Sequence, residues 1–167
     1  MKQRFTSKQT SINSIKAPAV YSMKRAVNVM TGKTVVDIGG GRFDTAAEAA
    51  RVYGAAVSIY DPFNRTPEHN AAVLAGSYDV AVISNVLNVI DSEAARGDVV
   101  RLAATKAAAL LIQTDQLRKT RSQRLTFSFV AVMMNHNASA FLCGLKAGFA
   151  FVPASVVYRN DKNPIFP

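Results

Sequence analysis

The sequence is poor in the residues that build disulfides, zinc sites and membrane spans. Cys143 is the single cysteine, which excludes an internal disulfide and favours a reducing compartment. One cysteine and two histidines, His69 and His136, are too few for a structural zinc site, and we expect no metal. No apolar run approaches the ~20 residues of a membrane span. Because no apolar block follows the basic N-terminus, we expect no secretory signal, no membrane partner and a cytoplasmic protein.

Charge is distributed unevenly along the chain. The 167 residues, 49% of them hydrophobic, suit one domain with a substantial core, and the net charge is +9. Residues 1–33 hold seven basic and no acidic residues, 34–115 hold six basic against ten acidic, and 116–167 hold seven basic against one acidic. Two interpretations stay open: the basic ends attract nucleic acid or another polyanion, or they form a solvated surface.

A buried strand followed by a glycine turn organises the sequence. Val35, Val36 and Ile38 suit a central strand covered on both faces. Three consecutive glycines, 39–41, then permit positive φ and a close approach of ligand to backbone. The segment 45–48, Thr-Ala-Ala-Glu, has capping-box spacing and predicts a helix start. Strand, turn and helix together predict a nucleotide-type site at the carboxyl edge of a parallel sheet.

Two acids near this turn narrow the choice of ligand. The dinucleotide pattern Gly-x-Gly-x-x-Gly fails because its last position is Asp44. Asp37, two residues before the first glycine, suits a cationic ligand or an amino group. Asp61 follows the predicted strand 57–60, where an acid can accept hydrogen bonds from two ribose hydroxyls. Asp61 also suits a nicotinamide enzyme, which stays an alternative.

The next segments predict a sheet with a shortened edge. Only residues 62–77 separate Asp61 from the next strand, which leaves room for a helix over 68–75 and little or no third strand. A buried strand is expected at 78–83 and runs into the segment 84–90, Ser-Asn-Val-Leu-Asn-Val-Ile. A helix to about Thr105 and a strand over 107–112 follow.

Three segments carry a family resemblance: Asp37–Gly41, Asp61–Arg65 and Asn85–Ile90. They resemble class I S-adenosylmethionine-dependent methyltransferases, including small bacterial and phage proteins similar to those associated with DNA phosphorothioation. The resemblance covers about residues 4–115. It implies an α/β, three-layer Rossmann-like fold with a mostly parallel sheet of six or seven strands. Residues 34–167 would then form a single S-adenosylmethionine-binding domain.

The resemblance also implies a set of site residues. The cofactor-binding residues would be Asp37, Gly39, Gly40, Gly41, Asp61, Pro62, Phe63, Asn85 and Val86. Asp61 would hold the ribose hydroxyls, the glycine backbone would approach the methionine part, and Asp37 would orient its amino end. Asn85 and Val86 would lie near the sulfonium. Phe63 has two open interpretations, a partner stacked on a purine and a core residue under its loop.

The acceptor of the methyl group is not identified by these motifs. Amino-methylating DNA enzymes use Asp/Asn/Ser-Pro-Pro-Tyr/Phe, whereas Asn85 is followed by Val-Leu. Cys143 lies in an apolar Phe-Leu-Cys-Gly-Leu setting, which indicates a buried small hydrophobe rather than a nucleophile. His69 is expected to be a solvated loop residue. We therefore predict a methyltransferase of unknown acceptor and name no general base. The alternative is a catalytically inactive Rossmann-like module that binds nucleic acid.

The two ends of the chain are less informative. The pattern of residues 20–30 predicts an amphipathic helix. This helix could cover the cofactor as a lid or pack on the edge of the sheet, and we favour the second interpretation. After Thr114 the resemblance fades, and a basic loop is expected at 117–124. The apolar run 125–134 is of uncertain type. A helix over 139–147 and two short strands, 149–152 and 155–158, would close the sheet with an antiparallel strand.

Overall fold

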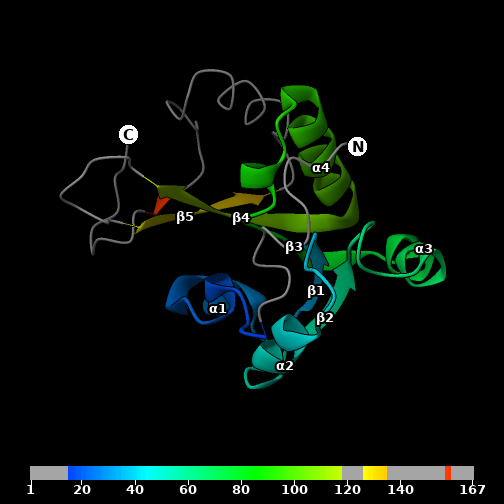
Figure 1. Cartoon of the computed structure of the whole chain (residues 1–167). Coiled ribbons are helices and arrows are strands. Elements are labelled where there is room, and N and C mark those ends of the chain that lie inside the picture. Colours follow the sequence, from blue (N-terminus) through cyan, green and yellow to red (C-terminus); the bar gives the residue numbers. More distant parts are fainter. Residues whose placement is uncertain (1–14, 118–125, 135–156, 159–167) are drawn as a thin grey trace.

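A six-stranded sheet forms the centre of the computed structural model, which describes residues 15–117, 126–134 and 157–158 (Figure 1). The helical elements are η2 (Ala19–Tyr21), α1 (Lys24–Met30), α2 (Thr45–Arg51), α3 (Pro67–Ala75), η3 (Leu87–Val89) and α4 (Glu93–Lys106). The strands are β1 (Thr34–Ile38), β2 (Ala56–Tyr60), β3 (Tyr78–Ser84), β4 (Ala107–Leu117), β5 (Thr126–Met134) and β6 (Val157–Tyr158). The spatial order of the strands is β2-β1-β3-β4-β5-β6.

The sheet is mostly parallel, as predicted. β2, β1, β3 and β4 run parallel, with Val36 opposite Ser58 on one side and opposite Ala81 on the other. β5 is antiparallel to β4, and β6 is antiparallel to β5. The prediction of an α/β fold is therefore confirmed, and the arrangement is compatible with a Rossmann-like fold.

Helices cover both faces of the sheet and give it two hydrophobic cores. In Figure 1, α4 lies on one side of the sheet, and α1 and α2 lie on the other. The core under α4 includes Val36, Ile38, Ala81, Ile83, Val99, Val100, Leu110 and Ile112. The core under α1 and α2 includes Val35, Val80, Val82, Leu111, Met30, Ala46 and Ala50. Successive residues of one strand enter opposite cores, since side chains alternate across a sheet, and this explains the unbroken apolar runs.

The shortened edge of the sheet is also confirmed. The chain leaves β2, forms α3 and enters β3 directly, with no strand between them. Thr66 begins α3, because its side chain accepts a hydrogen bond from the His69 N–H at 3.2 Å and Pro67 occupies the first turn. β3 then pairs with β1 on the side away from β2, so β2 is an edge strand.

Two predicted helix starts differ in detail from the structure. α2 begins at Thr45 as expected, but its N-cap is Asp44, whose side chain makes no capping bond, so the capping box is wrong. The Asp44 carboxylate instead pairs with Arg65, at 2.8 Å. The helix predicted over 20–30 is divided into η2 and α1, which pack under the sheet in the same core as α2.

The end of the chain is described in part. The apolar run 125–134 contains β5, and β4 extends to Leu117 because β5 pairs with it as far as Leu117 opposite Thr126. The predicted strand 155–158 contains β6. The predicted helix 139–147, the strand 149–152 and most of the basic loop lie outside the described residues.

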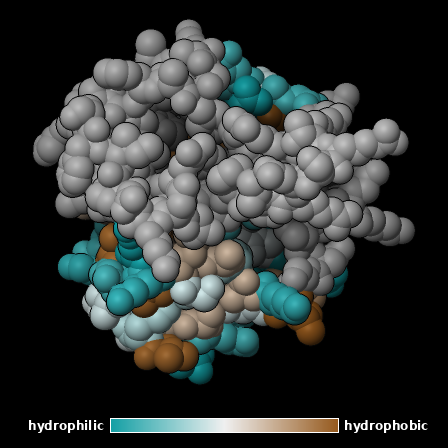
Figure 2. Space-filling model, turned by 90° about the vertical axis from the view of Figure 1, so that its left-hand side faces the viewer, coloured by the Kyte–Doolittle hydropathy of each residue, from teal (hydrophilic) through white to brown (hydrophobic). Residues whose placement is uncertain are grey.

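The described surface carries few large exposed hydrophobic residues. Ile15, Val52 and Phe63 are the exposed ones among the residues whose side chains are described. Figure 2 shows hydrophobic and hydrophilic residues interspersed over the described part of one face. Within the described ranges, no helix is both long enough and apolar enough to span a bilayer.

Candidate functional site

The predicted site lies where the sheet topology changes direction. β1 stands between β2 and β3, and the connections that leave β1 and β3 cross opposite faces of the sheet. α2, which follows β1, packs in one core, while α4, which follows β3, packs in the other. In open α/β sheets, ligands bind at the carboxyl ends of the strands at such a position. The glycine turn after β1 and the segment after β3 both lie there.

The glycine turn is shaped by close contacts that a side chain would prevent. Gly39 has φ +81°, its N–H donates to the Tyr60 carbonyl at 2.7 Å, and a Cβ there would lie 2.5 Å from Cγ2 of Val86. A Cβ on Gly40 would lie 2.9 Å from Cγ of Asp37. The structure therefore brings Asp37, the turn and Val86 together, as the sequence predicted.

Asp37 is a buried carboxyl, and among the described residues only one of its two oxygens has a hydrogen-bond partner. The residue is 1% exposed, and its Oδ2 accepts a hydrogen bond from the Tyr21 hydroxyl at 2.8 Å. Its Oδ1 has no hydrogen-bond partner among the described residues. Burial raises the pKa of Asp37 from 3.8 to about 7; the Tyr21 hydrogen bond opposes the rise, and the nearby charge of Asp61 adds to it. Such an environment favours a protonated carboxyl or a cationic partner.

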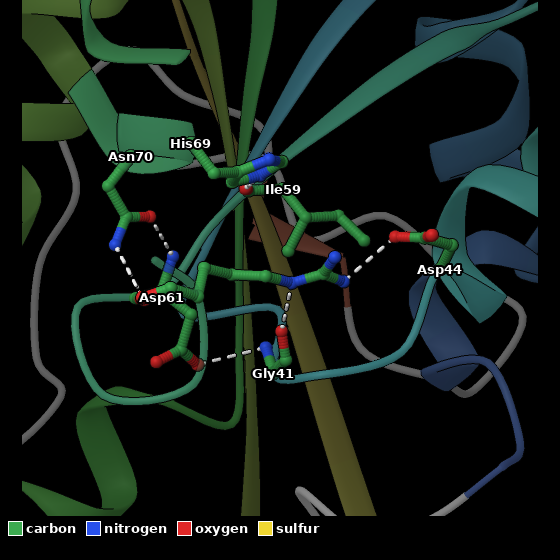
Figure 3. A network of polar contacts seen from close by, with 7 residues as sticks. Gly41, Asp44, Ile59, Asp61, His69 and Asn70 are labelled. Atoms are coloured by element: carbon green, nitrogen blue, oxygen red, sulfur yellow. Dashed lines mark hydrogen bonds and ion pairs between the residues drawn. The ribbon is translucent and has the colours of Figure 1, made fainter. Parts of the chain in front are cut away.

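Asp61 has a different environment, because its carboxylate accepts hydrogen bonds from neighbouring backbone and side-chain groups of the protein. It is 2% exposed. Its Oδ2 accepts from the Gly41 N–H at 2.9 Å, as Figure 3 shows. Its Oδ1 accepts from the Phe63 N–H at 2.9 Å and from the backbone and side-chain N–H groups of Asn64, each at 3.0 Å. Asp61 therefore fixes the turn after β2 to the glycine turn, and only Oδ2 retains a lone pair for a ribose hydroxyl.

Two residues whose contacts could not be identified from the sequence, Asn70 and Arg65, complete this network. The Asn70 side chain from α3 makes two bonds to the backbone of Asp61, accepting from N at 3.1 Å and donating to O at 2.9 Å (Figure 3). The guanidinium of Arg65 donates from Nε to the Gly41 carbonyl and from Nη2 to Asp44, at 2.9 and 2.8 Å. Arg65 belongs to a segment that the sequence marked, but no local pattern indicated its partners.

Pro62 and Phe63 lie on the turn that Asp61 organises. Both are exposed, and Phe63 is 52% exposed. This exposure shows that Phe63 is not the core residue that one of the two interpretations required. Its stacking on a purine stays a prediction.

The segment after β3 is held by a buried glutamine. Asn85 has φ +58°, and its N–H donates to the backbone carbonyl of Gln113 at 2.9 Å. The side-chain Oε1 of Gln113, which is 1% exposed, accepts from the Ser84 hydroxyl at 2.9 Å and from the Val20 N–H at 3.1 Å. Gln113, missed in the sequence, thus joins η2 to the end of β3 and the middle of β4.

His69 does not lie free in a loop. It belongs to the first turn of α3, and its Nε2 is 2.7 Å from the Ile59 carbonyl, so this nitrogen carries a proton and donates (Figure 3). Among the described residues, no group of three or more His, Cys, Asp or Glu side chains is arranged to hold a metal ion.

The described geometry brings together most of the predicted site. Asp37, the three glycines, Asp61 and Val86 are connected by the contacts above, with Pro62, Phe63 and Asn85 on the adjoining segments. No protein-family model, curated protein or solved structure matches the chain.

Proposed function

We propose that the chain binds S-adenosylmethionine at the carboxyl ends of β1 and β3 and transfers its methyl group to an acceptor that is not identified. The observation that carries the proposal is the buried Asp37 carboxyl, whose Oδ1 has no partner among the described residues. Burial of an unpaired carboxyl costs stability, and a cationic ligand group compensates this cost. The amino-acid part of S-adenosylmethionine carries an ammonium group of this kind.

The glycine turn supports the same ligand. Any side chain on Gly40 would fill the space next to Asp37, and a side chain on Gly39 would clash with Val86. The backbone can therefore approach a ligand where the strands end. In the proposal, Asp37 and the turn hold the amino-acid part, and Asn85 and Val86 lie beside the sulfur.

Methyl transfer from S-adenosylmethionine mainly requires the protein to position the two reactants. When bound, S-adenosylmethionine supplies a methyl group on a positively charged sulfur, which an acceptor lone pair can displace in line. Residues at the site then need to orient the two reactants and exclude water. A general base is needed only for a protonated acceptor, and no described residue is assigned that role.

Asp61 has an indirect role in this proposal. Because its carboxylate already accepts four hydrogen bonds from Gly41, Phe63 and Asn64, it acts mainly by fixing the two turns. Counting the bonds from described residues, the remaining lone pair of Oδ2 is the contact that Asp61 can offer to a ribose hydroxyl. Phe63, on the same turn and half exposed, is the candidate for stacking on the adenine.

The same observation favours a second function. If Asp61 serves only the fold, the domain need not bind a nucleoside, and the basic segments 1–33 and 116–167 then point to a non-catalytic module that binds nucleic acid. Affinity for DNA or RNA that falls steeply with salt, without any affinity for S-adenosylmethionine, would select this function.

Calorimetric titration tests the proposal. Wild-type protein is titrated with S-adenosylmethionine, S-adenosylhomocysteine and NAD, alongside Asp37→Asn and the matched control Asp79→Asn. Asp79 is an exposed carboxyl near the amino end of β3, away from the carboxyl ends where the proposed site lies. We expect saturable binding of the first two ligands, weakened at least about tenfold in Asp37→Asn and unchanged in Asp79→Asn. A folded protein that binds neither ligand, or that prefers NAD, contradicts the proposal.

A further inference from the structure

The short helix η2, which precedes the sheet in the chain, contacts the proposed ligand site through Tyr21. Tyr21, at the end of η2, is 2% exposed, and its hydroxyl donates to Oδ2 of Asp37 at 2.8 Å. Its neighbour Val20 donates its N–H to Gln113 Oε1 at 3.1 Å. Two buried hydrogen bonds thus fix η2 against the end of β1 and the middle of β4, and α1 lies between η2 and Asp37 in the chain.

The Tyr21 hydroxyl makes the two oxygens of the Asp37 carboxyl different. Oδ2 is engaged by Tyr21, and it lies 3.0 Å from the place of a Cβ on Gly40. Oδ1 has no partner in the part of the chain that the structure describes. A carboxyl torsion is broad and soft on its own, so a single directed hydrogen bond decides which oxygen faces a ligand.

We propose that Tyr21 is a positioning residue of the ligand site: its hydroxyl orients the Asp37 carboxyl so that Oδ1 receives the ammonium group of a ligand with a free amino-acid part. This inference rests on the proposed function for the identity of the ligand. It adds that affinity for the amino-acid part depends on a residue that precedes the sheet.

The electrostatics around the pair agree with this role. Burial, with the charge of Asp37, holds the pKa of Tyr21 well above its usual range, and Tyr53 adds to the rise, so the hydroxyl remains a donor at neutral pH. The groups that act on Asp37 in turn are Tyr21, whose bond lowers the pKa of the carboxyl, and Asp61, which raises it. The bond therefore favours the ionised form of Asp37, which an ammonium group needs.

Loss of the hydroxyl has a defined consequence. Tyr21→Phe retains the buried ring but removes the bond, so the pKa of Asp37 rises above about 7 and less of the carboxyl is ionised at neutral pH. Loss of one charge-assisted bond that acts on the ligand contact weakens binding about tenfold. A ligand without the ammonium group should not be affected.

The test compares two ligands and two matched variants. S-adenosylhomocysteine carries the amino-acid part, and 5′-methylthioadenosine lacks it. The control is Tyr78→Phe, which removes a tyrosine hydrogen bond to the Val73 carbonyl at 2.9 Å, at the amino end of β3. Calorimetry gives the affinities, and a carbon-13 NMR titration of the Asp37 carboxyl gives its pKa in each protein.

We expect Tyr21→Phe to weaken S-adenosylhomocysteine about tenfold, to leave 5′-methylthioadenosine unchanged and to raise the pKa of Asp37, whereas Tyr78→Phe changes none of these. Equal affinities in wild type and Tyr21→Phe overturn the inference alone. If wild type binds neither ligand, the proposed function fails, and the ligand role of Tyr21 fails with it. Should Tyr21→Phe not fold, the wild-type titration decides: bound S-adenosylhomocysteine must lower the pKa of Asp37, and an unchanged pKa overturns the inference.

Discussion

Replacement of Asp37 by asparagine should stabilise the protein at alkaline pH relative to wild type, while it weakens ligand binding. The carboxyl is 1% exposed, and its pKa in the folded protein is about 7 against an ordinary 3.8. Because the folded pKa is the higher one, the folded state holds a proton that the unfolded state has released. The stability from this proton is complete below pH ~4 and is lost as the pH rises to ~7.

The size of the effect follows from the two pKa values. For a carboxyl whose pKa shifts from 3.8 to about 7, linkage gives a total loss of about 4 kcal/mol by pH 8, of which about 3 kcal/mol falls between pH 5 and pH 8. The asparagine side chain of the variant does not ionise, and its oxygen can still accept the hydrogen bond from the Tyr21 hydroxyl. The free energy of unfolding of Asp37→Asn, relative to wild type, should therefore rise by about 3 kcal/mol between pH 5 and pH 8.

Urea unfolding at pH 5, 6.5 and 8 measures this difference. Both proteins are compared at each pH, so that titration of every other group cancels. A difference that does not change with pH would mean that Asp37 titrates as an ordinary carboxyl, with the same pKa in the folded and unfolded states. A variant that is more stable and yet binds no ligand would have the behaviour expected of a residue retained for function at a cost in stability.

Three further experiments test the contacts of the site and of the control residue Asp79. Asp61→Ala leaves the donors of two turns without their acceptor and should lower the free energy of unfolding by ~3 kcal/mol at pH 7 with no ligand present, measured in urea; a loss within experimental error would contradict the network. Gly39→Ala places a Cβ 2.5 Å from Val86 at φ +81° and should cost at least ~2 kcal/mol, part of which a second substitution, Val86→Ala, restores; no recovery in the double variant would exclude the clash as the cause. Asp79→Asn should show the opposite pH dependence to Asp37→Asn. Bonds from Thr34 lower the pKa of Asp79, so its contribution is present at neutral pH and is lost as the pH falls through that lowered pKa; thermal unfolding between pH 2.5 and 7 checks this, and a constant difference would refute it.

The elements of the sheet could be predicted because their signals are local. The apolar run before the three glycines predicts β1 and the turn, and the short interval between Asp61 and the next strand predicts the missing strand at the edge of the sheet. Asp37 and Val86 could also be placed together, since both lie at carboxyl ends of parallel strands.

The supporting contacts could not be predicted, because no local pattern encodes them. Tyr21 and Asp37 are 16 residues apart, and Val20 and Gln113 are 93 apart. In the sequence, Asp61 has the position of a ribose-binding acid. Its bonds to Gly41, 20 residues away, and to its own turn appear only when the turns are folded together. The capping-box prediction failed for the same reason, since it did not include the distant Arg65.

Amide chemical shifts of nitrogen-15-labelled protein during titration with S-adenosylmethionine report where the ligand binds. If the ligand binds at the carboxyl ends of β1 and β3, the largest saturable shift changes fall on Gly39, Gly40, Gly41 and Val86. Thr34, at the amino end of β1, should then show little change. A folded protein without saturable changes, or with changes confined to other regions, would contradict the account.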